Sequence, residues 1–95
     1  MRTYIAIAAT MLLVFSAGSH ADTWSESYKL EAAGNYGKAA QLFDPLLKQA
    51  PGNEFARLRR AWLHYLAGDY NDSQSDYKKA LQANPRSLDA QIGLT

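Results

Sequence analysis

The chain contains no cysteine, and this absence excludes several kinds of chemistry at once. Disulfide bridges, thiolate metal sites and a cysteine nucleophile all require that residue. Histidine is also scarce, with two residues in 95. A nucleophile needs a nearby base and an orienting group, and His64 has no serine at helical spacing beside it. The sequence therefore predicts no catalytic residue, no cofactor, no metal site and no enzyme.

An excess of charge of one sign is also missing. The formal net charge is +1, which gives no electrostatic footprint for nucleic acid or another polyanion. The length of 95 residues allows one small domain at most. Hydrophobic residues make up 47% of the chain, enough for a core, so wholesale disorder is excluded.

The N-terminal segment has the pattern of an export signal. Arg2 supplies a positive charge, and residues 5–17 form an apolar stretch too short to span a bilayer comfortably. Small residues stand three before and one before a cleavage point after Ala21. We predict a signal peptide over residues 1–21 and export to a bacterial periplasm or by secretion, with no stable membrane span after cleavage. An uncleaved anchor or a core helix is the alternative.

The rest of the chain repeats itself at an offset of 34 residues. Coincident pairs include Gly34 with Gly68, Tyr36 with Tyr70, Phe43 with Tyr77, Leu58 with Ile92, and Pro51 with Pro85. Repeats are therefore predicted over about 20–53 and 54–87, with a partial third over 88–95, inside one domain of residues 22–95.

Each repeat reads as two helices. The predicted helices cover residues 24–33, 37–49, 54–67 and 71–83, and a further helix starts at residue 88. Gly34 and Gly68 should end the first helix of each pair, because glycine accepts the left-handed conformation of a helix C-terminus. Pro45 lies inside the second helix and should bend it.

The second repeat carries a recognisable motif. Its residues are Ala61-Trp62, Gly68-Asp69-Tyr70, Tyr77, Ala80-Leu81 and Pro85. This pattern resembles the tetratricopeptide repeat (TPR), and the resemblance extends over residues 22–95. It implies an all-α fold of antiparallel helix pairs stacked as a short right-handed superhelix, with about two repeats plus the start of a third. It also implies a protein or peptide partner, bound on a concave face lined by the first helix of each pair.

Aromatic residues gather on one side of the helix predicted over residues 54–67, and the resemblance places that side on the concave face. The candidate protein-binding residues are Trp24, Tyr28, Phe55, Leu58, Arg59, Trp62 and Tyr65. Such a groove suits an apolar or aromatic segment of a partner, with Arg59 or Glu31 setting its register. The sequence thus predicts a scaffold or adaptor of the cell envelope.

The alternative is a truncated structural piece of a larger envelope protein, with the same aromatic residues packed internally or in a homo-oligomer. Two repeats and a fraction make a marginal array, which favours a fragment or self-association. One TPR subtype grips a C-terminal carboxylate with lysine and asparagine. Leu58 and Trp62 stand at those positions, so that partner class is excluded.

Polar residues on the predicted helices give three further expectations. Arg60 occupies a position that is usually apolar in the family, and we expect it to pair with Glu26, its equivalent one repeat earlier. The cluster formed by Arg57 and the neighbouring arginines is expected to be a solvated face. Asp72 and Asp76 are expected to form a solvated helix start, which the helix dipole favours.

Overall fold

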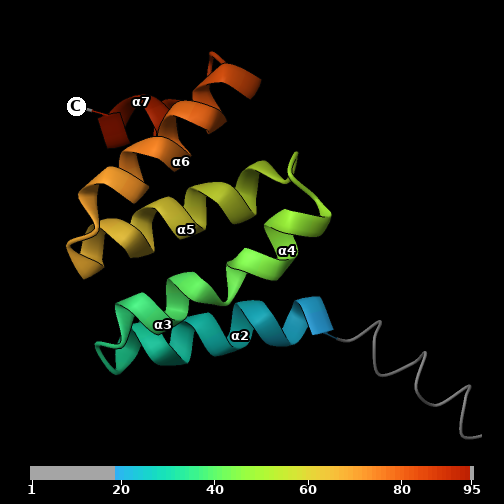
Figure 1. Ribbon diagram of the computed structural model, residues 1–95, viewed down its shortest axis with the longest axis vertical. Coiled ribbons are helices and arrows are strands. Elements are labelled where there is room, and N and C mark those ends of the chain that lie inside the picture. Colours follow the sequence, from blue (N-terminus) through green and yellow to red (C-terminus); the bar gives the residue numbers. More distant parts are fainter. Residues whose placement is uncertain (1–18, 95) are drawn as a thin grey trace, which may run out of the picture.

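A computed structural model describes residues 19–94, and this part of the chain consists of helices joined by short turns, with no strand (Figure 1). The helices are α2 (Ser19–Ala32), α3 (Tyr36–Gln41), α4 (Phe43–Gln49), α5 (Glu54–Ala67), α6 (Tyr70–Ala83) and α7 (Leu88–Leu94). The all-α class predicted from the sequence is confirmed, and the packed helices are consistent with a TPR-like helical repeat.

Neighbouring helices pack in chain order. Helix α2 packs on α3, α3 and α4 pack on α5, and α6 lies between α5 and α7 (Figure 1). Two buried clusters hold the stack together. The first contains Ala39, Ala40, Phe43, Leu46, Leu47, Ala56 and Leu63, and the second contains Ala61, Tyr77, Ala80 and Ala90. The first cluster joins α3 and α4 to α5, and the second joins α5, α6 and α7, so each cluster crosses the boundary between consecutive repeats.

The helix ends follow the local sequence. Gly34 and Gly68 have φ values of 80° and 84°, the left-handed conformation predicted for both. The side-chain oxygen of Asn53 accepts a hydrogen bond of 3.1 Å from the backbone N–H of Ala56 and so caps α5. Glycine therefore ends the first helix of each pair at the predicted places, and Asn53 caps the start of the second repeat.

Pro45 explains why one predicted helix is found as two. The segment predicted over residues 37–49 is divided into α3 and α4 at Leu42. Proline has no N–H to bond the carbonyl of Gln41, and its ring crowds that carbonyl, so the helix cannot continue undisturbed. The predicted bend is confirmed. Asp44, next to Pro45, contacts Arg60 of α5.

Gly93 allows α7 to lie against α6. A methyl group added at Gly93 would lie 2.4 Å from the ring of Tyr77, closer than real contacts permit. Tyr77 is buried, so its ring has little room to move away. The absence of a side chain at Gly93 thus brings Asp89 and Ile92 of α7 beside the residues of α5.

The predicted signal peptide lies mostly outside the described residues and stays a prediction. Helix α2 begins at Ser19, so the predicted cleavage point after Ala21 falls in its first turn. Within residues 19–94, every helix is too short or too polar to cross a membrane.

Candidate functional site

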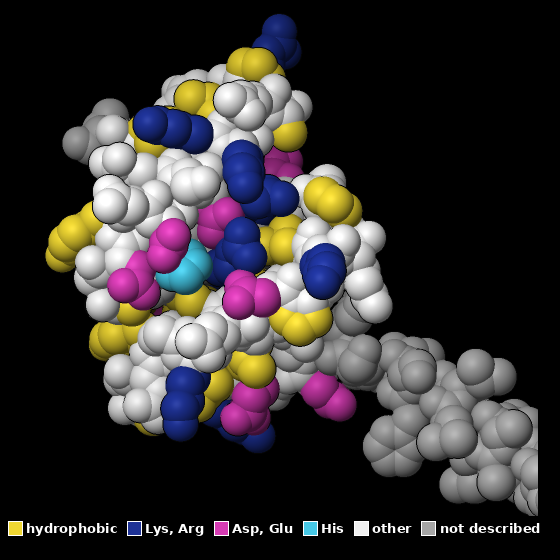
Figure 2. All heavy atoms as spheres, in the orientation of Figure 1, with side chains coloured by type: hydrophobic (Ala, Val, Ile, Leu, Met, Phe, Trp, Pro, Cys, Tyr) yellow, Lys and Arg dark blue, Asp and Glu magenta, His cyan; other side chains and the backbone are white. Residues whose placement is uncertain are grey.

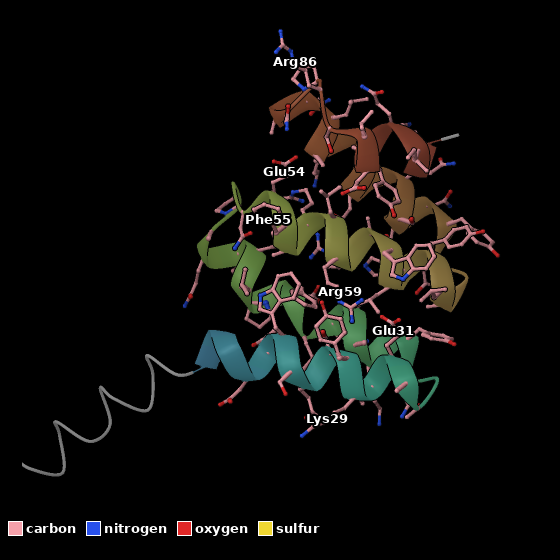
Figure 3. All side chains as sticks on the ribbon, turned by 180° about the vertical axis from the view of Figure 1, so that it is seen from behind. Lys29, Glu31, Glu54, Phe55, Arg59 and Arg86 are labelled. Carbon is pink, nitrogen blue, oxygen red and sulfur yellow. The ribbon has the colours of Figure 1, made fainter. Side chains whose placement is uncertain are left out.

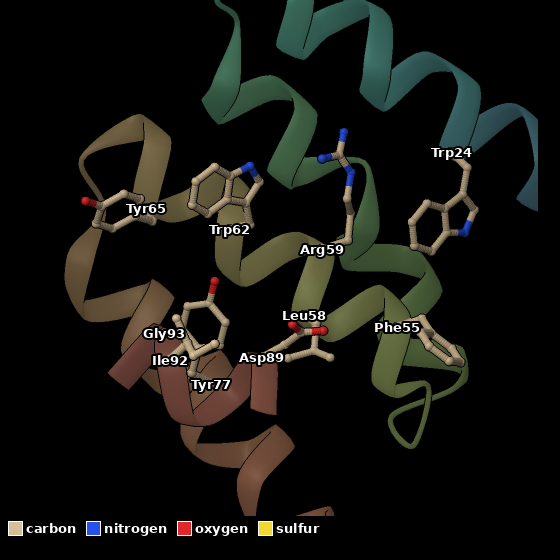
Figure 4. A pocket seen from close by; sticks show the side chains of 10 residues that line it. All are labelled: Trp24, Phe55, Leu58, Arg59, Trp62, Tyr65, Tyr77, Asp89, Ile92 and Gly93. Carbon is tan, nitrogen blue, oxygen red and sulfur yellow. The ribbon is translucent and has the colours of Figure 1, made fainter. Parts of the chain in front are cut away.

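A groove of ≈ 770 Å³ runs between α2, α5 and α7 (Figure 4). Six of the seven candidate residues line it: Trp24, Phe55, Leu58, Arg59, Trp62 and Tyr65. The seventh, Tyr28, adjoins it through Arg59, whose guanidinium carbon lies 4.2 Å from the centre of the Tyr28 ring. The structure therefore brings the predicted set together in one place.

The groove also has a wall that the candidate set did not include. Tyr77 of α6 and three residues of α7, Asp89, Ile92 and Gly93, complete its lining. The repeat offset held the signal for two of them, because it aligns Phe55 with Asp89 and Leu58 with Ile92. Equivalent positions on successive first helices face the same groove.

Several aromatic side chains of the groove are exposed, and no other described residue covers them. Phe55 is 76% exposed, Tyr65 52% and Trp62 43%. The rings of Trp62 and Tyr65 stack at 5.6 Å with an interplanar angle of 22°. Trp24 differs, because it packs edge-on against buried Phe43 at 5.1 Å. Trp24 is thus partly a core residue, whereas the other three present apolar surface to whatever enters the groove.

Arg59 ties the two main walls of the groove together. Its guanidinium pairs with Glu31 of α2 and donates to the Ser27 hydroxyl at 3.2 Å, and Figure 3 shows Arg59 directed toward Glu31. The Arg59 side chain is only 10% exposed, so the expectation of a solvated arginine face is wrong here. Each of its three guanidinium nitrogens bonds a residue of α2, and these bonds fix α2 against α5.

A second ionic cluster, centred on Asp76, joins α5 to α6. Arg60 donates to both carboxylate oxygens of Asp76 at 2.7 Å, and Arg57 donates to one of them at 3.2 Å. Arg60 also reaches Asp44 of α4 at 3.0 Å. The hydrogen bond to Asp76 is the main reason that the pKa of Arg60 is raised, against the opposing effect of burial. Acidic and basic side chains are seen gathered on this face in Figure 2.

This cluster corrects the expectations about Arg60, Asp76 and Arg57, whereas Asp72 is exposed in the first turn of α6 as expected. Arg60 pairs with Asp76 and Asp44, so the predicted pairing with Glu26 is wrong. Asp76 is 2% exposed and is no part of a solvated helix start. Arg57 is likewise mostly buried, at 12% exposure of its side chain. The burial of Asp76 could have been predicted from its position. Helical spacing puts it on the same buried face as Ser73, Tyr77 and Ala80.

One group of side chains in residues 19–94 has the composition of a metal site. One ligand atom each from His64, Asp69 and Asp72 lies within 4.8 Å of the others. The Nδ1 atom of His64 is buried without a hydrogen bond and lies 3.7 Å from an Asp69 oxygen. Asp69 and Asp72 are exposed at the start of α6, where carboxylates are favourable without a metal. Their geometry therefore needs no ion to explain it.

Tyr77 links the groove to a measurable pH dependence. Burial raises its pKa, and the charge of Asp89 raises it further. A raised pKa in the folded state gives a contribution to stability that is complete below the unfolded pKa of about 10 and is lost as the pH rises through the folded pKa. We expect the free energy of unfolding to fall above about pH 10, and to fall less steeply in Tyr77→Phe.

Urea titrations at about pH 9 and about pH 11 would measure this, with wild type and Tyr77→Phe compared at each pH. The other tyrosines and the lysines titrate in both proteins, so only the difference between them reports on Tyr77. An Asp89→Asn variant should show a smaller fall than wild type, because one of the two causes is removed. If the free energy of unfolding fell equally between the two pH values in all three proteins, the pKa of Tyr77 would not be raised by its surroundings.

The sequence of the chain matches one known protein family. The family model described as Tetratricopeptide repeat matches residues 30–75. The match supports a tetratricopeptide-repeat family for this chain. The matched segment runs from the end of α2 to the first half of α6 and so contains the whole α5 wall of the groove. Neither the curated proteins nor the solved structures that were compared gave a match.

The family match suggests a broad function. TPR units generally form non-catalytic scaffolds, and the repeat suggests a protein–protein interaction module. The groove of this chain is aromatic on α5, and Leu58 and Trp62 are among the residues that line it. The two ionic clusters lie between helices and hold the helix stack together. The site therefore combines a fixed scaffold with exposed apolar side chains.

Proposed function

We propose that the chain is an exported adaptor of the cell envelope that holds a segment of a protein partner in the aromatic groove. The observation that carries the proposal is the exposure of Phe55, Trp62 and Tyr65 in one hollow. Burial of apolar surface on a partner would supply affinity, at about 25 cal/mol per Å². Aromatic side chains are also the residues that most often dominate protein interfaces.

The rigidity of the groove supports the same proposal. Arg59 holds α2 on α5, and the Asp76 cluster holds α5 on α6, so the groove walls are fixed before a partner arrives. A preorganised site loses less entropy on binding. Because each guanidinium nitrogen of Arg59 already bonds a residue of α2, its role in this proposal is to set the spacing of the walls rather than to grip the partner. Specificity then depends on the shape and chemistry of the groove lining.

Export is supported by the N-terminal pattern alone, namely Arg2 followed by the apolar residues 5–17 and small residues before Asp22. Expression with the native N-terminus in a bacterial host would test it. Recovery from the envelope fraction with an intact mass that begins at Asp22 is the expected result. Recovery from the cytoplasm at full mass would contradict export.

A photo-crosslinking amino acid in place of Tyr65 tests the groove directly. Tyr65 is half exposed and lines the groove, so the crosslinker would project into the partner's position. A discrete crosslinked protein from the native compartment is expected. The same crosslinker in place of Gln74 is the matched control, because Gln74 is exposed on α6 and does not line the groove. Crosslinks only to a second copy of the chain would favour the structural alternative, and identical products from both positions would contradict groove binding.

A further inference from the structure

Two charged side chains line the groove, and they differ in how far the chain itself neutralises them. Arg59 is paired with Glu31 and hydrogen-bonded to Ser27. Asp89 lies on α7 and is exposed, and none of the ion pairs within residues 19–94 includes it. Figure 4 shows its side chain entering from α7, across the groove from Trp24. The groove therefore carries one uncompensated charge, and that charge is negative.

We propose that the partner segment carries a lysine or arginine that pairs with Asp89, next to the apolar or aromatic side chains that fill the rest of the groove. This inference rests on the proposed function and adds the chemistry of the partner to it. The occupant is thus a basic and apolar peptide segment, rather than an acidic one.

The argument is one of charge complementarity. A purely apolar occupant would bury the Asp89 carboxylate without a counter-charge, which is costly. An acidic occupant would meet Asp89 with like charge, and the positive charge of Arg59 is already paired with Glu31. A basic side chain removes both problems.

The aromatic neighbours favour the same chemistry. Trp62 and Tyr65 stack beside each other on the α5 wall and remain about half exposed. The face of an indole or phenol ring attracts a lysine or arginine cation. Within the same molecule Arg59 already makes such a contact with Tyr28, at 4.2 Å. The groove thus offers a basic segment exposed aromatic faces in addition to the Asp89 carboxylate.

A random peptide library displayed on phage would test the inference, with the full chain as bait. Peptides selected by wild type should be enriched in aromatic residues together with lysine or arginine. Asp89→Lys should select peptides enriched in aspartate or glutamate instead. Asp72→Lys is the matched control, because Asp72 occupies the first turn of α6, is exposed and lies outside the groove lining. Its selected peptides should keep the wild-type preference.

Affinities of one selected peptide then give the size of the effect. Replacement of its basic residue by glutamate should weaken binding to wild type at least tenfold, and Asp89→Lys should reverse that order. If Asp89→Lys does not fold by circular dichroism, Asp89→Asn replaces it and should bind both peptides within threefold of each other.

The outcomes separate this inference from the function on which it rests. Aromatic enrichment without a basic preference overturns the inference and leaves groove binding in place. A basic preference that survives in the Asp89 variants also overturns it, because the charge is then read elsewhere. If no peptide is selected, or if every selected peptide still binds Trp62→Ala, the proposed function itself is contradicted.

Discussion

Replacing Asp76 with alanine is expected to lower the free energy of unfolding by about 3 kcal/mol, because Arg57 and Arg60 would remain mostly buried without their shared carboxylate. Asp76 is 2% exposed, so water cannot take its place easily. A domain of this size has a total stability of roughly 5 kcal/mol. The variant should therefore melt at least about 10 °C below wild type.

Urea denaturation followed by circular dichroism measures this effect. Asp72→Ala is the matched control, since it removes an exposed aspartate from the same helix and should change stability by less than about 0.5 kcal/mol. A triple variant that changes Arg57, Arg60 and Asp76 to leucine removes the whole cluster. It should recover most of the loss, because an apolar replacement leaves no buried charge unpaired. Equal stabilities of Asp76→Ala and wild type would show that the cluster does not contribute.

Replacing Trp62 with alanine is expected to weaken partner binding by about 30-fold or more while helicity and stability hardly change. Trp62 is 43% exposed and lies in neither buried cluster, so its loss should cost less than about 1 kcal/mol of stability. At an interface the same side chain would be desolvated between Tyr65 and the partner, where a tryptophan contributes most.

The partner identified by crosslinking at Tyr65 provides the binding assay, and circular dichroism provides the folding readout. Leu88→Ala is the matched control, because Leu88 is a large side chain at 70% exposure that does not line the groove. Its binding should stay within threefold of wild type. Loss of helicity in Trp62→Ala would instead show that the tryptophan is internal packing. Unchanged binding would exclude the α5 wall as the contact surface.

The backbone of this protein was largely predictable because its signals are local. Gly34, Gly68 and Pro45 each act on their own neighbours through allowed φ values or a missing N–H, and each does what its residue type dictates. The apolar face of α5 was equally accessible, since helical spacing decides which side chains share a side. These features could be predicted without knowing which other helices pack against each segment.

The ionic contacts were not predictable in the same way. Glu26 and Asp76 are both acidic residues that a repeat could bring near Arg60, and only the packing of α6 on α5 selects Asp76. Arg59 and Arg60 are adjacent in sequence, yet they face different helices and have different partners. Periodicity assigns a residue to a face, but the choice of partner depends on distances of a few ångströms between helices.

Asp89 illustrates the same limit for the groove. Asp89 lies in the first turn of the short helix α7, and only comparison with the previous repeat, where Phe55 is its equivalent, relates it to the groove. Its presence in the groove lining depends on how closely α7 approaches α6, and Gly93 makes that approach possible. A site residue that is positioned by a third element is invisible to patterns within its own segment.

The double attachment of Arg60 has a consequence for how the array unfolds. One guanidinium binds Asp44 of the first repeat and Asp76 of the second, so a single side chain is shared by two units. In linear arrays, cooperativity depends on the energy of the junction between neighbours. Unfolding of the first repeat would break the ion pair between Arg60 and Asp44. The Arg60 guanidinium in the second repeat would then be less well neutralised. The two repeats should therefore lose structure in a single transition rather than one after the other.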